Sequence, residues 1–290
     1  MSWIELLENN PILLYGVTAL FALIVGSFLN VVIFRLPKMM EQDWRQDCAS
    51  LTNETGTEPR EQCLSLAHPG SHCRHCGHPV RPLENIPLLS YLFLRGRCFA
   101  CGERIGLRYP LVEAATALLS VLVVWRFGTG WDSAAALLLT WGLIALAIID
   151  YDTQLLPDAI SIPLLWLGLL MSLGGWFTDS HSAILGAALG YLSLWSVFHV
   201  FRLLTGKEGM GFGDFKLFAL FGAWFGWQFL PQIILLSACT GALAGSALIL
   251  AQGRDSQAPI PFGPYLAAAG WISLMWGDAI NRTYLQWAGL

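Results

Sequence analysis

The stretch PILLYGVTALFALIVGSFLNVVI, residues 11–33, decides the fold of this chain. It contains no charged residue, and it is long enough for an α-helix to cross the hydrocarbon of a bilayer, which takes roughly 20 residues. The whole chain has 290 residues, of which 55% are hydrophobic and 12% charged, and further apolar runs of similar length follow the first. The sequence therefore predicts a polytopic membrane protein.

Apolar runs along the chain predict an all-α fold with about eight transmembrane helices. The sixth and seventh runs are of marginal length, and only a tight turn at Trp227 and Pro231 separates them. Glu5 and Glu8 precede the first run without any Lys or Arg, so this run lacks the positive region of a cleaved signal peptide and is expected to remain as a helix. The predicted spans are residues 11–33, 110–127, 133–150, 159–177, 183–203, 214–230, 231–251 and 262–280.

The basic residues predict the orientation of these spans. Most of them lie between the first and second spans, which places that loop in the cytoplasm, because Lys and Arg concentrate in cytoplasmic loops. Counting spans from there puts loops 151–158 and 204–213 on the same side. The basic residues of the first loop are Arg35, Lys38, Arg45, Arg60, Arg74, Arg81, Arg95, Arg97, Arg104 and Arg108.

Two aspartates lie where an apolar run meets one of these cytoplasmic loops. They are Asp150, in AIIDYDTQLLPD, and Asp214, in GMGFGDFKLFALFG. An ionisable side chain at membrane depth usually marks a functional site. Two carboxyl groups held close together share a proton, so that one acts as an acid and the other as a base, as in an aspartic protease. We therefore expect a catalytic pair at the cytoplasmic rim.

Residues near this pair have more than one interpretation. Gly211 and Gly213 let the backbone approach another chain while Asp214 lies at a helix start, which favours substrate access. Lys216 either tunes the pair electrostatically or extends to the membrane boundary as an ordinary lysine. Asp152 and Asp158 are interpreted first as loop residues that cap helix ends.

Four cysteines form two C-x-x-C pairs, and a glycine follows each pair, which is typical of a zinc ribbon or knuckle. The four are Cys73, Cys76, Cys98 and Cys101. Disulfides and redox-active thiols are the alternatives, but the cytoplasmic placement argues against disulfides. Zinc would be structural here, because a closed shell of four sulfurs leaves no open position for a substrate. Cys48 and Cys63 receive no function.

Other features have ordinary interpretations. The segments GAALG (186–190) and GALAGSA (241–247) contain small residues that allow helices to pack closely. The formal net charge is −4, and no basic stripe with interleaved aromatic residues is present, so no nucleic-acid partner is expected.

Taken together, the motifs resemble those of the bacterial type IV prepilin peptidases, membrane aspartic proteases of the GxGD type. The resemblance covers nearly the whole chain. It rests on the paired C-x-x-C knuckles and on GSFLNVVIFRLP (26–37), RYPLVE (108–113), IDYDTQLLPD (149–158) and GMGFGDFKLFALFGAWFG (209–226).

The resemblance implies a function and a location. Asp150 and Asp214 would be the catalytic dyad, with Asp152 as the second candidate for the first position. The enzyme would remove the leader peptide of prepilins and pseudopilins at the cytoplasmic face of the bacterial inner membrane. Members with the cysteine module also methylate the new N-terminus with S-adenosylmethionine, although the sequence has no glycine-rich nucleotide loop of the soluble methyltransferase kind.

The resemblance also covers residues of the first two spans. Gly26, Asn30 and Arg35 match the family's N-terminal motif, although Gly26 and Asn30 equally suit helix packing and interhelical hydrogen bonding. Glu113, just inside the second span, either faces the site or binds an arginine. Which pilins are processed and the oligomeric state are left open.

We expect three domains: a first transmembrane helix (1–36), a cytoplasmic zinc-knuckle domain (37–108) and a seven-helix membrane peptidase domain (109–290). A polar insert at 41–67 widens the second of these. Two competing functions are a proton-coupled transporter with a zinc-stabilised regulatory loop and a structural scaffold of a pilus or secretion assembly. A transporter would more often carry its acidic residues near the midplane in repeated halves, and a scaffold would leave the aspartates without a role.

Overall fold

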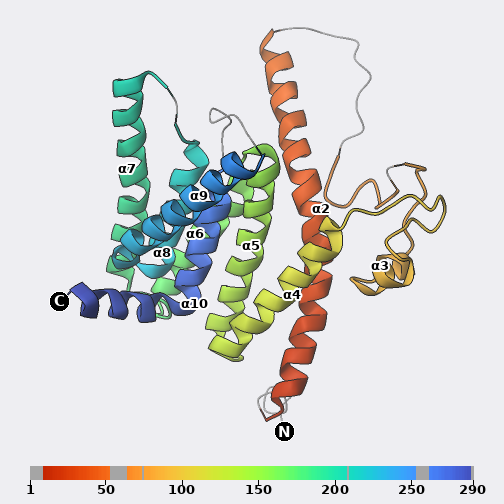
Figure 1. Ribbon diagram of the computed structural model, residues 1–290, viewed down its shortest axis with the longest axis horizontal. Coiled ribbons are helices and arrows are strands. Elements are labelled where there is room, and N and C mark those ends of the chain that lie inside the picture. Colours follow the sequence, from red (N-terminus) through yellow and green to blue (C-terminus); the bar gives the residue numbers. More distant parts are fainter. Residues whose placement is uncertain (1–8, 53–63, 74, 208, 253–260, 289–290) are drawn as a thin grey trace. The chain divides into compact units, whose positions relative to one another are not determined.

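The fold is built from helices. The computed structural model describes residues 9–52, 64–73, 75–207, 209–252 and 261–288. In this described part, β pairing is limited to two isolated bridges, His72 with Pro79 and Arg97 with Arg104, which confirms the predicted all-α class. The helices of Figure 1 are α2 (Pro11–Thr52), η1 (Pro82–Asn85), α3 (Leu89–Phe93), α4 (Arg108–Phe127), α5 (Trp131–Thr153), α6 (Asp158–Ser172), α7 (Ser180–Thr205), α8 (Phe212–Phe225), η2 (Trp227–Phe229), α9 (Leu230–Gln252) and α10 (Gly263–Ala288).

Each of the eight predicted spans coincides with a helix, but not every helix is long enough to cross a bilayer. Among the described residues, five are long and apolar enough: α2, α4, α5, α7 and the segment Trp227–Ala247 that contains most of α9. Helices α6 and α8 have 15 and 14 residues, which corresponds to roughly 22 Å, less than the roughly 30 Å of hydrocarbon. The described part of the chain is therefore helical, with five candidate membrane-spanning helices, and α6 and α8 are shorter than a straight span requires.

The chain divides into two compact units, Met1–Gly128 and Thr129–Leu290. In the first unit, α2 packs along α4. A Cβ on Gly26 would lie 2.8 Å from the Glu113 Cα, so only glycine permits this approach of the two helices. The Asn30 amide donates to the Tyr109 carbonyl at 3.1 Å. The packing interpretation of Gly26 and Asn30 therefore agrees with the structure.

Helix α2 is longer than its apolar run. It continues through Pro37 to Thr52 and so includes the first part of the polar insert, while residues 53–63, with Cys63, lie outside the described residues. An ion pair between Glu41 and Arg45, at 2.7 Å, supports the polar extension. The predicted domain boundaries at residues 36 and 108 stay predictions.

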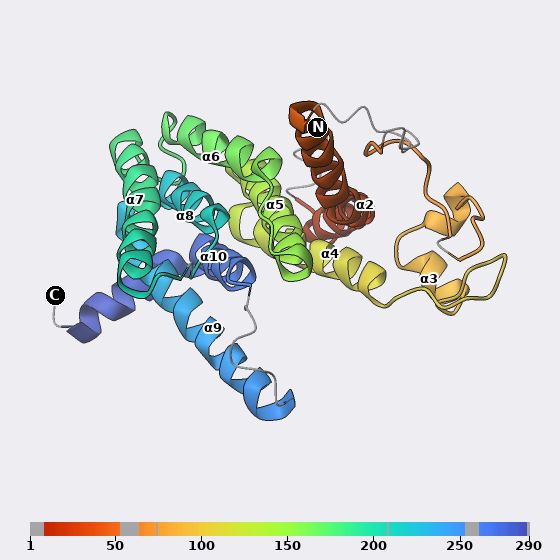
Figure 2. The ribbon, with the colours of Figure 1, turned by 90° about the horizontal axis from the view of Figure 1, so that it is seen from above.

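In the second unit, α8 lies between α6 and α7 (Figure 2). All of its residues from Leu217 to Phe225 are buried. Trp224 donates to the Leu164 carbonyl of α6 at 2.8 Å. On the other side, a Cβ on Gly190 of α7 would lie 2.8 Å from the Phe218 carbonyl oxygen. Small residues thus bring α7 directly onto the backbone of α8, as the GAALG segment indicated.

Candidate active site and metal centre

Asp150 lies in the last turn of α5, and only 5% of it is exposed. The carbonyl groups at a helix C-terminus disfavour a carboxylate there. A donor from elsewhere offsets this cost: the backbone N–H of Gly263, the first residue of α10, donates to Asp150 Oδ2 at 2.9 Å. Asp150 is therefore a buried acid with one oxygen fixed by a backbone group from a different helix.

Asp214 lies in the first turn of α8, as expected, and is 7% exposed. Its backbone N–H donates to the Gly211 carbonyl at 3.2 Å. Its Oδ1 atom is buried and has no hydrogen-bond partner among the described residues. A buried carboxyl oxygen without a partner is costly, so this atom is available to a water, a shared proton or a substrate.

The helix ends that carry the two aspartates approach each other. A Cβ on Gly213 would lie 2.7 Å from Leu156 Cβ, in the loop between α5 and α6, so glycine at this position lets the start of α8 approach the loop that follows Asp150. The Asp150 carboxyl group acts electrostatically on the Asp214 carboxyl group. The end of α5 and the start of α8, which carry the two carboxyl groups, therefore lie close together.

The neighbouring charged residues have other partners. Lys216 Nζ lies 2.7 Å from both carboxylate oxygens of Asp158, so it links α8 to α6. Asp158 is the first residue of α6, the N-cap is Pro157, and no side-chain cap is formed; the capping interpretation of Asp158 was wrong. Asp152 is exposed.

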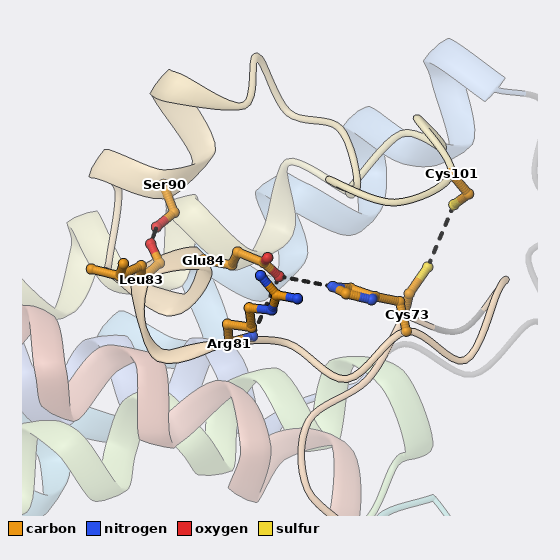
Figure 3. Close-up of polar contacts among 7 residues, drawn as sticks. Cys73, Arg81, Leu83, Glu84, Ser90 and Cys101 are labelled. Atoms are coloured by element: carbon orange, nitrogen blue, oxygen red, sulfur yellow. Dashed lines mark hydrogen bonds and ion pairs between the residues drawn. The ribbon is translucent and has the colours of Figure 1, made fainter.

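The four cysteines of the two C-x-x-C pairs form one cluster. Their sulfur atoms all lie within 4.8 Å of one another, and the Sγ atoms of Cys73 and Cys101 are 3.8 Å apart (Figure 3). Tetrahedral zinc with Zn–S bonds of about 2.3 Å requires sulfurs about 3.8 Å apart. Gly77 and Gly102, which follow the two pairs, have φ of +73° and +71°, as the predicted knuckle turns require. The donor set and its geometry fit a structural zinc ion.

The electrostatics of the cluster suit a bound cation. Backbone N–H groups of Cys76 and His75 lower the pKa of Cys73 to about 6. For Cys101, the backbone contact with Glu103 acts in the lowering direction, but desolvation and the neighbouring thiols outweigh it and raise the pKa to about 12. Several thiolates this close together repel one another, and a divalent cation at the centre of the cluster removes that repulsion.

The polar contacts of the cysteine module replace a hydrophobic core. None of its described apolar side chains, in residues 64–107, is among the fully buried ones. Instead, Glu84 accepts from the Arg81 backbone N–H at 3.3 Å and lies 3.3 Å from His78, and the Ser90 hydroxyl donates to the Leu83 carbonyl at 2.8 Å (Figure 3). A module without a core depends on cross-links such as a metal.

Two buried charged residues attach this module to its helices. Glu113 of α4 accepts from the Leu88 backbone N–H at 2.9 Å. Arg35, which is buried, donates to the carbonyl groups of Ser65 and Leu66 at 2.9 and 3.2 Å. The alternatives that Glu113 faces the site or binds an arginine stay predictions.

Sequence reasoning missed Gly263. Its signal was the segment PFGP, residues 261–264, at the start of the last apolar run. Proline in the first turn indicates the start of a helix, and the glycine beside it leaves the backbone there uncovered by a side chain. Such a start can present its N–H groups to an anion, but the sequence alone does not identify Asp150 as that anion.

Comparisons with known proteins agree with the motifs. Residues 20–127 match the family model of the bacterial peptidase A24 N-terminal domain, and residues 137–246 match that of the type IV leader peptidase family. A prepilin leader peptidase/N-methyltransferase of Pseudomonas aeruginosa is 55% identical over 100% of this chain and 99% of the relative. Proteins of the same description from Aeromonas hydrophila and Legionella pneumophila are 54% and 44% identical, each over 97% of both chains. No solved structure matches the chain significantly.

Proposed function

Because the chain belongs to the type IV leader peptidase family, we propose that it is a membrane aspartic endopeptidase whose catalytic pair is Asp150 and Asp214. Its substrates are prepilins and pseudopilins, and it removes their leader peptides at the cytoplasmic face of the bacterial inner membrane. The relatives that match over the full length are named both peptidases and N-methyltransferases. The proposal therefore includes methylation of the new N-terminus with S-adenosylmethionine.

One observation carries the peptidase assignment. Two buried carboxyl groups from different helices interact with each other, and one oxygen of Asp214 has no partner among the described residues. Buried acids that stabilised the fold would be fully hydrogen-bonded. An incompletely satisfied pair at the end of apolar helices suits a site whose missing partners are a water and a peptide carbonyl.

The pair can perform peptide hydrolysis without a covalent intermediate. One carboxylate takes a proton from a water molecule, which attacks the carbonyl carbon of the scissile bond. The other carboxyl group protonates the carbonyl oxygen, and a proton then passes to the leaving amine as the C–N bond breaks. The Gly263 N–H keeps Asp150 Oδ2 in place, so that one acid stays fixed while protons move.

The cysteine cluster has a different role in this proposal. Cys73, Cys76, Cys98 and Cys101 hold a zinc ion, and four thiolates leave it no open position for a substrate. The zinc ion would cross-link the two C-x-x-C pairs and so stabilise the module. The module is proposed to serve the methyltransferase reaction or substrate binding.

The test measures product masses from a prepilin peptide incubated with purified protein, with and without S-adenosylmethionine. Asp150→Asn and Asp214→Asn are each expected to abolish the leader-cleaved product, a loss of about 10³-fold or more, while membrane insertion and metal content stay unchanged. Asp152→Asn serves as the matched control, because it carries the same change two residues from Asp150 on the exposed side of α5. Full activity of either single variant would remove that residue from the pair.

The transporter alternative is not supported. The family models and the named relatives cover nearly the whole chain and describe peptidases. In addition, both acids lie at helix ends, Asp150 in a last turn and Asp214 in a first turn, whereas transporter acids more often lie near the membrane midplane.

A further inference from the structure

Helix α3, a five-residue segment of the cysteine module, exposes its apolar side chains and hides its polar ones. Leu92 and Phe93 are 74% and 81% exposed, and Leu89 is also exposed. By contrast, the Ser90 hydroxyl accepts from the Ile86 N–H at 3.0 Å and is buried. This distribution is the reverse of the one expected for a helix that faces water.

The polar side chains of α3 hold it against the rest of the module. Besides its bond from Ile86, Ser90 donates to the Leu83 carbonyl at 2.8 Å, and Tyr91 donates to the Ile105 carbonyl at 3.4 Å. The outward direction of Leu92 and Phe93 is therefore fixed by contacts on the opposite side of the helix. A rearrangement that buried them would break these hydrogen bonds.

A second observation places α3 at the depth of the membrane surface. The backbone N–H of Leu88, the residue before α3, donates to Glu113 Oε2 at 2.9 Å. Glu113 lies five residues into the candidate span Arg108–Phe127, which is roughly 7 Å along the helix axis. Apolar faces of interfacial helices enter the boundary between headgroups and acyl chains to about 5–10 Å.

Positive charges flank the apolar surface. Arg95 and Arg97 follow α3 directly, and both are exposed. Arginines beside an apolar face are typical of segments that bind anionic lipids, since the guanidinium groups reach the phosphates while the apolar side chains enter the acyl region.

We propose that α3, with Leu89, Leu92 and Phe93 as its contact residues, is an interfacial membrane anchor that holds the cysteine module on an anionic bilayer surface. The occupant of this surface is lipid. The anchor would restrict the module to the depth at which its connection to Glu113 already places it. The inference is independent of the proposed peptidase function, because it uses neither aspartate.

The experiment uses the full chain, loaded with metal, in bilayers that contain nitroxide-labelled phospholipids. A fluorescent amino acid replaces Phe93 in one variant and Glu103, an exposed residue of the second knuckle, in the control. We expect lipid nitroxides to quench the reporter at 93 about threefold more than the reporter at 103. Replacing phosphatidylcholine by phosphatidylglycerol should increase the quenching at 93.

Two outcomes would overturn the proposal. Equal quenching at 93 and 103 would mean that α3 faces water. Loss of quenching at 93 on addition of a prepilin peptide would mean that the apolar surface binds substrate rather than lipid. If the reporter at 93 lowers the metal content, the same fluorescent amino acid is placed at Leu89, which lies on the same surface. Its quenching then tests the proposal in the same way.

Discussion

Gly263 has no side chain because the Asp150 carboxylate occupies the space where one would lie. A Cβ at this position would come 2.6 Å from Asp150 Oδ2. We predict that Gly263→Ala displaces the carboxylate and lowers kcat for leader cleavage about 100-fold with little change in KM, since a misplacement of about 1 Å costs that much. Steady-state kinetics on a prepilin peptide measures the two constants separately.

The matched control is Gly241→Ala, in α9 of the same unit. There an added Cβ would lie 3.4 Å from the Tyr265 ring, an ordinary contact, so kcat should stay close to that of the unsubstituted protein. A Gly263→Ala enzyme with normal kcat would show that the backbone contact to Asp150 does not position it for catalysis.

The ion pair with Asp158 explains the position of the Lys216 side chain. Its ion pair with Asp158 is partly exposed, with 32% and 59% of the two side chains accessible, and such pairs contribute about 0.5 kcal/mol. We predict that Lys216→Met and Asp158→Asn each lower the free energy of unfolding by about that amount, and that the double variant loses no more than either single one. Reversible unfolding of the unsubstituted protein, the two single variants and the double variant in mixed micelles measures these free energies. Additive losses would mean that Lys216 has a further partner, such as the catalytic pair.

At the scale of elements, the contact of α7 with α8 depends on glycine. A Cβ on Gly186 would lie 2.8 Å from the Gly222 carbonyl carbon and 2.9 Å from that of Gly226. We predict that Gly186→Val separates the helices and lowers the free energy of unfolding by about 2 kcal/mol, the usual cost of overpacking. Thermal unfolding in detergent measures this, with Gly16→Val in α2 as control, because nothing lies within 4 Å of that Cβ position. Equal losses in both variants would argue against the close packing.

The elements themselves could be predicted from the lengths of the apolar runs, because a run of about 20 apolar residues has few alternatives to a membrane helix. The ends of the elements could not be predicted in this way. Helix α2 continues to Thr52 because helix propensity and an ion pair at i, i+4 act outside the membrane as well. For Asp158, the fixed φ of Pro157 makes proline a suitable residue before the first turn, and the aspartate then pairs with Lys216 instead of capping.

At the scale of the whole molecule, the sequence predicted the two acids of the candidate site but not the backbone group that binds one of them. Asp150 and Asp214 followed from membrane topology and a specific motif, and their assignment as the catalytic pair stays a prediction. The Gly263 donor could not be predicted, because it is 113 residues from Asp150 in the sequence and the contact depends on how α10 packs. The outward face of α3 also depends on hydrogen bonds that no local pattern specifies.

Removal of the metal tests whether the cysteine module and the unit that contains α5 to α8 are stabilised independently. Residues 64–107 have no fully buried apolar side chain among those described, so we expect the free energy that folds them to come largely from a metal ion held by the four cysteines. We predict that Cys73→Ser lowers bound zinc to less than about one-tenth of one equivalent. Amide hydrogen exchange in 64–107 should rise, whereas α5 to α8 should keep their protection, because that unit has its own core.

The control for this prediction is Cys239→Ser, in α9, outside the cysteine cluster. It should leave both the metal content and the exchange unchanged. Leader cleavage by Cys73→Ser should survive in part, since Asp150 and Asp214 belong to the other unit. Unaltered zinc content in Cys73→Ser would contradict the four-thiolate site, and loss of protection in α5 to α8 would show that the metal also stabilises the unit that carries the two aspartates.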